Sequence, residues 1–192
     1  MQLLKDRILR DGKHLGRGIL KVDAFMNHQI DPVLMKSIGE EFARRFRPVQ
    51  ASRILTAETS GIAPALAVAM ALEVPLIFAR KHRPVTMTAD AFRERAESHT
   101  KGGEVELLVS SEYLLKEDRV LIVDDFLATA KTISALVKLV GQSGAVLVGV
   151  GAVIEKAFEG GRRMLDGLGV PIESLAVIER FDDDRIVLAD AN

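Results

Sequence analysis

The sequence predicts an α/β fold in which a central parallel sheet is flanked by helices. Between residues 53 and 154, segments that are apolar almost throughout alternate with segments of helical pattern, which is typical of a parallel sheet covered on both faces. The 192 residues, of which 48% are hydrophobic, suit one domain with a sizeable core. No repeat, low-complexity segment or linker divides the chain, so residues 1–192 are expected to form a single unit.

The N-terminal part predicts two helices and a brief strand. Apolar residues between 3 and 9 repeat at helical spacing before Gly12, and residues 19–22 are typical of a short strand. Asp31-Pro32 is a strong helix start, because aspartate accepts hydrogen bonds from free N–H groups and proline has none to lose. This second helix is expected to reach about Phe46.

The remaining elements alternate in type. In chain order we expect a strand at 53–57, a helix at 62–72, strands at 76–80 and 119–123, a helix at 131–140, a strand at 146–154, a short helix at 163–168, and strands at 174–178 and 185–188. Between 81 and 101, charges, two histidines and threonines are interleaved without a sustained period. A loop of this length is either a mobile lid or a disordered insert.

Composition narrows the class of function. The 26 basic and 27 acidic side chains nearly cancel, so no global field favours nucleic acid or an anionic membrane, and a small charged metabolite fits better. The absence of cysteine excludes disulfides, thiolate metal sites and cysteine nucleophiles. The charged start lacks the apolar stretch of a signal peptide and the longest apolar run is too short to span a membrane, so we expect a cytoplasmic protein.

The most informative stretch runs from 119 to 132. An apolar strand ends in Asp124 and Asp125, and a turn with hydroxyl groups then opens a helix near Lys131. The carboxyl ends of strands face the ligand crevice in α/β sheets, and the first N–H groups of a helix attract anions. A ribose 5-phosphate carries both hydroxyls and a phosphate. The alternatives are a solvated acidic pair at a strand end and ordinary helix capping.

This stretch resembles the signature with which type I phosphoribosyltransferases bind phosphoribosyl pyrophosphate (PRPP). The resemblance implies that Asp124 and Asp125 bind the ribose hydroxyls. It also implies that the 5′-phosphate lies against five residues: Ala128, Thr129, Ala130, Lys131 and Thr132. Ala130 stands where the family usually has glycine, so PRPP affinity suffers if that position needs a positive φ.

A second strand end leads to the same family. The turn Glu58, Thr59, Ser60 and Gly61 before a helix resembles its pyrophosphate loop, and Arg80 and Lys81 follow the next strand. We expect these residues to bind pyrophosphate, with Lys81 contributing to catalysis, although a run of basic residues is more often a solvated turn. The resemblance also implies a lid over 86–101, whose most polar part is Ser98-His99-Thr100-Lys101.

The base would lie near Phe126, Lys156 and Asn27. Phe126 is either a stacking partner for a purine or a core residue, and Lys156 in isolation is more often a surface lysine. Facing C6 of a purine, an ammonium would favour a 6-oxo group over a 6-amino group, because it has donors only. Asn27 offers both a donor and an acceptor for a second oxo group.

Five segments in the same order closely resemble the bacterial xanthine phosphoribosyltransferases, namely 20–32, 58–64, 78–82, 124–128 and 153–156. The resemblance implies a cytoplasmic homodimer of purine salvage that uses xanthine and PRPP, with Leu20, Asn27 and Lys156 at the base. It implies a small hood from about 1–30 and 156–192, and Mg²⁺ that enters on the diphosphate of PRPP without dedicated protein ligands. A preference for hypoxanthine or guanine, or a non-catalytic PRPP sensor that regulates, remains an alternative.

Overall fold

The computed structural model of the chain describes residues 1–87, 90–97, 104–183 and 185–189. Its helices are α1 (Gln2–Asp11), α2 (Pro32–Phe46), α3 (Ile62–Leu72), α4 (Lys131–Ser143) and α5 (Gly161–Leu165), with a π-helical turn at Asp23–Asn27 and shorter 3-10 turns at Arg47–Val49, Ala157–Glu159 and Asp166–Leu168. Its strands are β1 (Lys13–His14), β2 (Leu20–Lys21), β3 (Arg53–Ala57), β4 (Leu76–Ala79), β5 (Ala91–Glu97), β6 (Glu104–Ser110), β7 (Arg119–Leu127), β8 (Val146–Lys156), β9 (Ile172–Asp182) and β10 (Arg185–Leu188).

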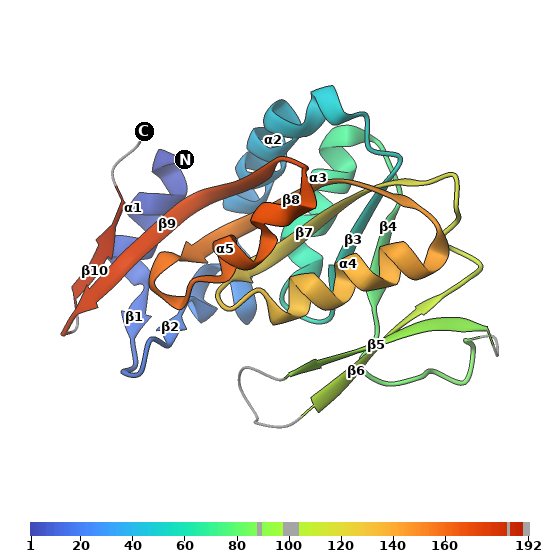
Figure 1. Cartoon of the computed structure of the whole chain (residues 1–192). Helices are drawn as coiled ribbons and strands as arrows, with labels where there is room; N and C mark the ends of the chain where they lie inside the picture. Colours follow the sequence, from blue (N-terminus) through green and yellow to red (C-terminus); the bar gives the residue numbers. More distant parts are fainter. Residues whose placement is uncertain (88–89, 98–103, 184, 190–192) are drawn as a thin grey trace.

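A six-stranded sheet forms the centre of the molecule (Figure 1), with strand order β10-β9-β8-β7-β3-β4. Neighbouring strands from β9 to β4 run parallel, and β10 adds to the edge antiparallel to β9. The predicted α/β fold is therefore confirmed, with one antiparallel edge strand in addition. Because β3 and β7 are neighbours, the turns that follow them lie at the same edge of the sheet.

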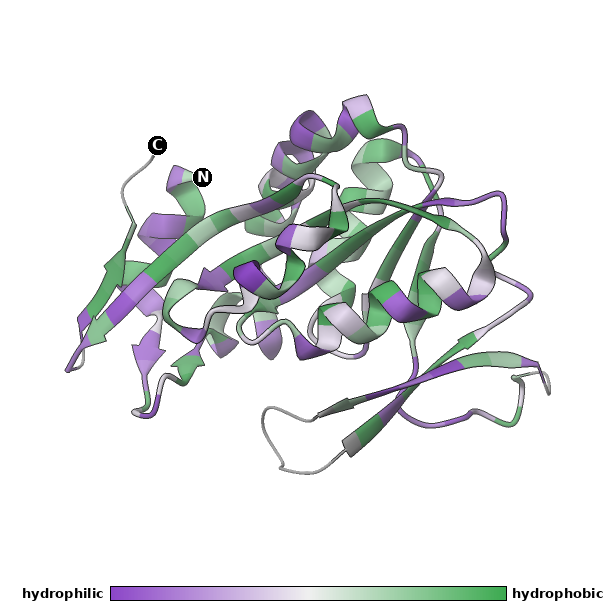
Figure 2. Ribbon diagram, in the orientation of Figure 1, coloured by the Kyte–Doolittle hydropathy of each residue, from purple (hydrophilic) through white to green (hydrophobic). Residues whose placement is uncertain are grey.

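Helices cover both faces of this sheet. Ile54, Leu121 and Val123 point to the face that α2 and α3 cover, whereas Leu55 and Ile122 point to the face under α4. This is the alternation of side chains along a strand. In Figure 2 hydrophobic residues follow the central strands, and polar residues gather on the outer turns of α2. The Asp31 cap is confirmed, since its Oδ1 accepts from Val33 N and Leu34 N at 3.0 and 3.1 Å.

The N-terminal segment and β10 both pack beside β9. The Met1 ammonium donates to Leu175 O at 2.7 Å, and His14 of the β1–β2 hairpin stacks on Phe181 with ring centroids 4.0 Å apart. These contacts bring residues 1–30 and the C-terminal strands together, but β9 also belongs to the central sheet. That the two segments act as a hood remains a prediction.

The expected structureless loop over 81–101 is wrong in part, because it contains β5. This strand pairs antiparallel with β6 in a hairpin that stands beside α4 (Figure 1). Arg80 joins the hairpin to the end of β4, through hydrogen bonds between its backbone and that of Leu108 at 2.8 and 2.9 Å. Residues 98–101, the most polar part of the expected lid, lie outside the described residues.

Several strands are longer than expected. β7 runs on to Leu127, because its C-terminal part stays paired with β8 after its pairing with β3 has ended at Ile122. β8 likewise extends to Lys156, and β9 covers Ile172–Asp182 instead of 174–178. Among the helices of the described chain, none is both long and apolar enough to cross a bilayer.

Candidate functional site

The acidic pair lies on the open flank of β7. Pairing with β3 ends at Ile122, whereas pairing with β8 continues past Asp124 to Leu127. Asp124 Oδ1 accepts from Asp125 N at 3.1 Å, and Asp125 Oδ1 accepts from Phe126 N at 3.0 Å. The sequence had predicted that the pair follows the end of a strand at residue 123. In the structure the pair lies inside the last part of β7.

Burial makes this pair electrostatically unusual. Asp124 is only 5% exposed, and Asp125 is partly exposed. Burial and then the neighbouring charge of Asp125 raise the pKa of Asp124 well above its ordinary value. Burial also raises the pKa of Asp125, against hydrogen bonds and the charge of Lys81 that act in the opposite direction. A ligand that brings hydroxyl donors or cations would relieve both carboxylates.

The turn after β7 leads directly into α4. Ala130 stands before the first residue of this helix with φ 63° and ψ 8°, in the left-handed region. The position where a glycine was expected therefore has a positive φ. Lys131 is exposed and Thr132 partly exposed at the helix start, where N–H groups and the helix dipole attract anions.

Gly161 supports this turn from the other side, which the sequence did not reveal. Its N–H donates to Ala128 O at 2.9 Å, and a Cβ built on Gly161 would lie 2.8 Å from Ala130 N. Only glycine permits this approach. Two adjacent glycines, Gly160 and Gly161, mark the place in the sequence, but they do not indicate which turn the chain approaches.

The turn after β3 approaches Asp124. A Cβ built on Gly61 would lie 2.5 Å from Asp124 Oδ1, so this position also requires the absence of a side chain. The peptide bond between Glu58 and Thr59 is cis. Thr59 and Ser60 line a groove of about 1110 Å³ on the α2 and α3 side of the molecule.

Arg80 and Lys81 are tied to this turn by Glu58. The Glu58 carboxylate accepts from the backbone N–H of Lys81 at 2.6 Å and pairs with Arg80 Nε at 2.9 Å. The Lys81 ammonium is exposed and acts on both aspartates of the acidic pair. At the edge of the sheet where β3, β4 and β7 end, carboxylates, the turn after β3 and two cationic side chains therefore lie close together.

On the other flank, Lys156 lies against Phe126. The Lys156 ammonium is 5.5 Å from the centroid of the Phe126 ring and 3.2 Å from Glu159 Oε1. Leu20 in β2 is buried, whereas Asn27 is exposed. Asn27 lines the same groove as Thr59 and Ser60, and Lys156 does not. The structure thus joins Phe126 with Lys156, and places Asn27 beside the turn after β3.

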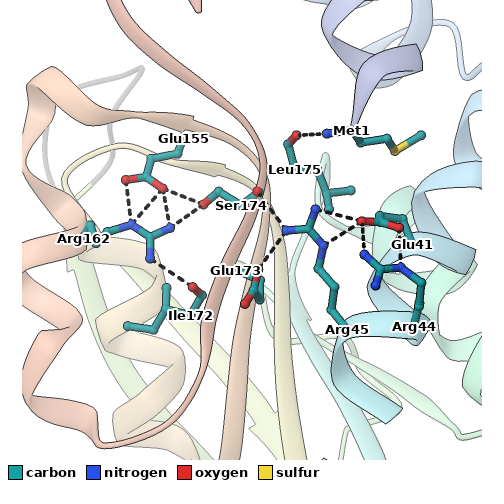
Figure 3. Close-up of polar contacts among 10 residues, drawn as sticks. All are labelled: Met1, Glu41, Arg44, Arg45, Glu155, Arg162, Ile172, Glu173, Ser174 and Leu175. Atoms are coloured by element: carbon teal, nitrogen blue, oxygen red, sulfur yellow. Dashed lines mark hydrogen bonds and ion pairs between the residues drawn. The ribbon is translucent and has the colours of Figure 1, made fainter. Parts of the chain in front are cut away.

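The segment from Lys156 to Gly161 is fixed by an ion pair between the buried Glu155 and the partly exposed Arg162, which the sequence did not indicate. Glu155 accepts from Arg162 Nε and Nη2 at 2.6 to 3.0 Å and from Ser174 Oγ at 2.6 Å (Figure 3). Since Glu155 precedes Lys156 and Arg162 follows Gly161, this ion pair closes a loop that carries both. Within the described residues, no group of three histidine or carboxylate side chains could hold a metal ion.

Comparison with known proteins gives a consistent result. Residues 42–186 match the family described as phosphoribosyl transferase domain. The chain is 50% identical over 191 residues to a xanthine phosphoribosyltransferase of Deinococcus deserti, covering 100% of this chain and 99% of that protein. It is 45% identical over 192 residues to a xanthine phosphoribosyltransferase of Latilactobacillus sakei, covering 100% and 98%.

The fold is shared with solved structures. The crystal structure of adenine phosphoribosyltransferase from Thermoanaerobacter pseudethanolicus matches with a TM-score of 0.66 and 29% identity, over 77% of this chain and 81% of that one. The sheet and its covering helices are therefore those of an established architecture.

Proposed function

The chain belongs to the phosphoribosyl transferase family, and we propose that it transfers the 5-phosphoribosyl group of PRPP to xanthine. The products are xanthosine 5′-phosphate and pyrophosphate, and the reaction, that of a pentosyltransferase, belongs to purine salvage. The observation that carries the proposal is the acidic pair on β7, which lies between the turn into α4 and the turn after β3. Full-length relatives that act on xanthine support the choice of base.

The acidic pair is assigned to the ribose. Asp124 and Asp125 accept from the 2′- and 3′-hydroxyls, which replaces the water that burial has removed. The 5′-phosphate lies at the start of α4, against residues 128–132, where its charge meets N–H donors and the helix dipole. The neutral hydroxyls and the negatively charged phosphate of one substrate thus meet separate parts of the site.

Pyrophosphate leaves toward the turn after β3. Backbone N–H groups of Thr59, Ser60 and Gly61 bind it there, and the Lys81 ammonium stabilises the negative charge that develops on the leaving group. Arg80 acts through Glu58, with which it is paired. Mg²⁺ arrives as part of the substrate, bound to the diphosphate of PRPP. Positive charge that develops on C1′ is stabilised by the two carboxylates, without a covalent intermediate.

The base lies over Phe126 with its 6-oxo group toward Lys156. The ammonium has donors only, so it leaves a 6-amino group unsatisfied. This distinguishes the present site from one that prefers adenine, although the two folds are alike. Leu20 contributes an apolar contact and Asn27 contacts the second oxo group of xanthine.

One assay tests the proposal. Pyrophosphate release from PRPP and Mg²⁺ is measured with xanthine, guanine, hypoxanthine and adenine in turn. We expect the highest kcat/KM with xanthine and the lowest with adenine. Preference for hypoxanthine or guanine would favour the alternative substrate, and tight PRPP binding without release from any base would favour a regulatory sensor.

A homodimer that works in the cytoplasm completes the proposal. It rests on the resemblance of the five sequence segments to the bacterial xanthine phosphoribosyltransferases. Sedimentation at micromolar concentration is expected to give twice the mass of the 21.0 kDa chain. A single-chain mass would contradict the dimer and leave the proposed reaction standing.

A further inference from the structure

Glu159 shares the candidate base site with Lys156, although nothing in the sequence motif pointed to it. Its Oε1 lies 3.2 Å from Lys156 Nζ, and the side chains of the two residues are only 18% and 13% exposed. The Lys156 ammonium in turn lies 5.5 Å from the centroid of the Phe126 ring. An acceptor and a donor are therefore presented side by side, at the ring on which the base is proposed to stack.

The neighbouring hairpin shows that Glu159 faces inward. Gly18, in the turn between β1 and β2, has φ 73° and lies over Phe158 and Glu159. A Cβ built on Gly18 would be 3.2 Å from the Phe158 ring and 3.8 Å from Glu159 Oε1. The same hairpin carries Leu20 in β2. Glu159 thus lies between the lysine and the hairpin, and not on an open surface.

The chemistry of the two side chains matches one edge of a 6-oxopurine. Such a base presents an acceptor, O6, next to a donor, N1–H. The ammonium of Lys156 can only donate and the carboxylate of Glu159 can only accept. Adenine reverses both groups, since its 6-amino group donates and its N1 accepts. A lysine alone can distinguish the two kinds of base only at position 6, whereas the lysine and the carboxylate together distinguish them at position 6 and at N1.

We propose that Glu159 is a specificity-determining residue that accepts the N1–H of the base while Lys156 donates to O6. The proposal rests on the proposed function, since it assumes a 6-oxopurine substrate. The base inserts between the two charged groups, and each charge exchanges its ion-pair contact for a hydrogen bond with the ligand. Each mismatched or missing hydrogen bond then weakens catalysis by about 5- to 150-fold.

Glu159→Ala and Glu159→Gln test the proposal, with Glu179→Gln as control because Glu179 is an exposed carboxylate on β9. For each variant, kcat/KM is measured with xanthine, guanine, hypoxanthine and adenine, together with KM for PRPP. We expect Glu159→Ala to lose about 5- to 150-fold with all three 6-oxopurines at unchanged KM for PRPP. Glu159→Gln keeps an acceptor oxygen and should restore part of this loss while narrowing the preference over adenine.

A methylated base separates the roles further. Wild type should discriminate strongly against 1-methylxanthine, which lacks N1–H, and Glu159→Ala should discriminate less. If Glu159 were only the counter-ion of Lys156, its removal would free the lysine and leave or raise kcat/KM for xanthine, which overturns the proposal. A loss that includes KM for PRPP would mark a structural role and overturn it as well. Wild type that does not use xanthine would instead refute the proposed function.

Discussion

Ala130 adopts a backbone conformation that is uncommon for a residue with a Cβ. Its φ of 63° places an alanine, 4% exposed, in the left-handed region at the start of α4. This conformation costs a residue with a Cβ about 1–2 kcal/mol. The turn to which phosphate binding is proposed therefore carries a cost that glycine would remove, and the sequence already indicated it, because Ala130 departs from the family pattern.

Exchange for glycine measures that cost. Ala130→Gly relieves the strain but loses a buried methyl group, worth about 0.8 kcal/mol, and adds freedom to the unfolded chain. Ala135 is a buried position within α4. Ala135→Gly also loses a buried methyl group and adds freedom to the unfolded chain, but it relieves no backbone strain. Urea unfolding should show Ala130→Gly to be less destabilising by roughly 1–2 kcal/mol. Equal losses would mean that Ala130 is not strained.

Asp124 is expected to lower the unfolding free energy at neutral pH while it contributes to activity. Its raised pKa means that the folded protein holds a proton more tightly than the unfolded chain. Stability is therefore lost as pH rises from the ordinary aspartate range, near about 4, to the raised pKa, and this loss is complete above it. Asp124→Asn should raise the unfolding free energy at neutral pH, and remove this pH dependence. Activity should fall about 10- to 150-fold or more, as expected for a lost hydrogen bond to a charged group.

Asp118 provides the opposite control. It is buried as well, and burial alone would raise its pKa, but hydrogen bonds from Leu115 N, Arg53 and Ser52 outweigh burial and lower the pKa. Its stabilisation is present above the ordinary aspartate range and is lost as pH falls through the lowered value. Asp118→Asn should thus destabilise the protein at neutral pH. If Asp124→Asn lowers the unfolding free energy at neutral pH, as Asp118→Asn is expected to do, the account of Asp124 is wrong.

At the scale of elements, β5 shows why a strand escaped notice. Phe92, Glu94 and Ala96 point inward, while Arg93 and Arg95 are exposed. This is the period-2 alternation of a strand, but a charged residue occupies one inward position. Glu94 is tolerated there because Lys138 Nζ, at 3.2 Å, and Gln142 Nε2, at 3.1 Å, contact its carboxylate. Only the position of α4 explains this, and no local pattern carries that information.

Gln142 fastens the hairpin to α4. Its amide accepts from Arg93 N at 3.1 Å and donates to Arg93 O at 2.8 Å, as a neighbouring strand would. Gln142→Ala should leave the helix intact and speed amide exchange at Arg93 by about 5- to 10-fold, equivalent to about 1 kcal/mol. Lys138→Ala, which breaks only an exposed ion pair, should have a smaller effect. Unchanged exchange in Gln142→Ala would show that the hairpin is held elsewhere.

At the scale of the whole molecule, the alternation of apolar strands and helices was enough to predict a parallel sheet. It also predicted that Asp124 and Asp125 lie toward the carboxyl end of a central strand, which the structure confirms, although the pair lies within the last part of β7 and not after it. That this edge binds the ligand remains a prediction. The contacts of Gly161 and Glu159 were not predictable, because they depend on how the segment after β8 packs against the turn before α4 and against the β1–β2 hairpin. Sites that rest on one strand end are visible in sequence, whereas sites that need two distant segments are not.

Ion pairs on both sides of β9 hold this strand in place. On one side of this strand Arg162 pairs with Glu155, whose side chain is 5% exposed, and on the other Arg45 pairs with Glu41 and Glu173 (Figure 3). Glu41 keeps a second partner, since the hydrogen bond from Arg44 is the largest cause that lowers its pKa to about 2.

Removal of either arginine should therefore have unequal effects. Arg162→Met leaves the buried Glu155 carboxylate with the hydrogen bond from the Ser174 hydroxyl (Figure 3). Because Arg162 is partly exposed, we expect a loss of about 2–3 kcal/mol in unfolding free energy, below the 3–5 kcal/mol of a fully buried pair. Arg45→Met leaves Arg44 on Glu41 and should cost less than about 1 kcal/mol. Because Glu155 precedes Lys156, KM for the base should rise in Arg162→Met and stay unchanged in Arg45→Met. Urea unfolding and steady-state kinetics of both variants measure this, and equal losses of stability would show that the two ion pairs hold β9 alike.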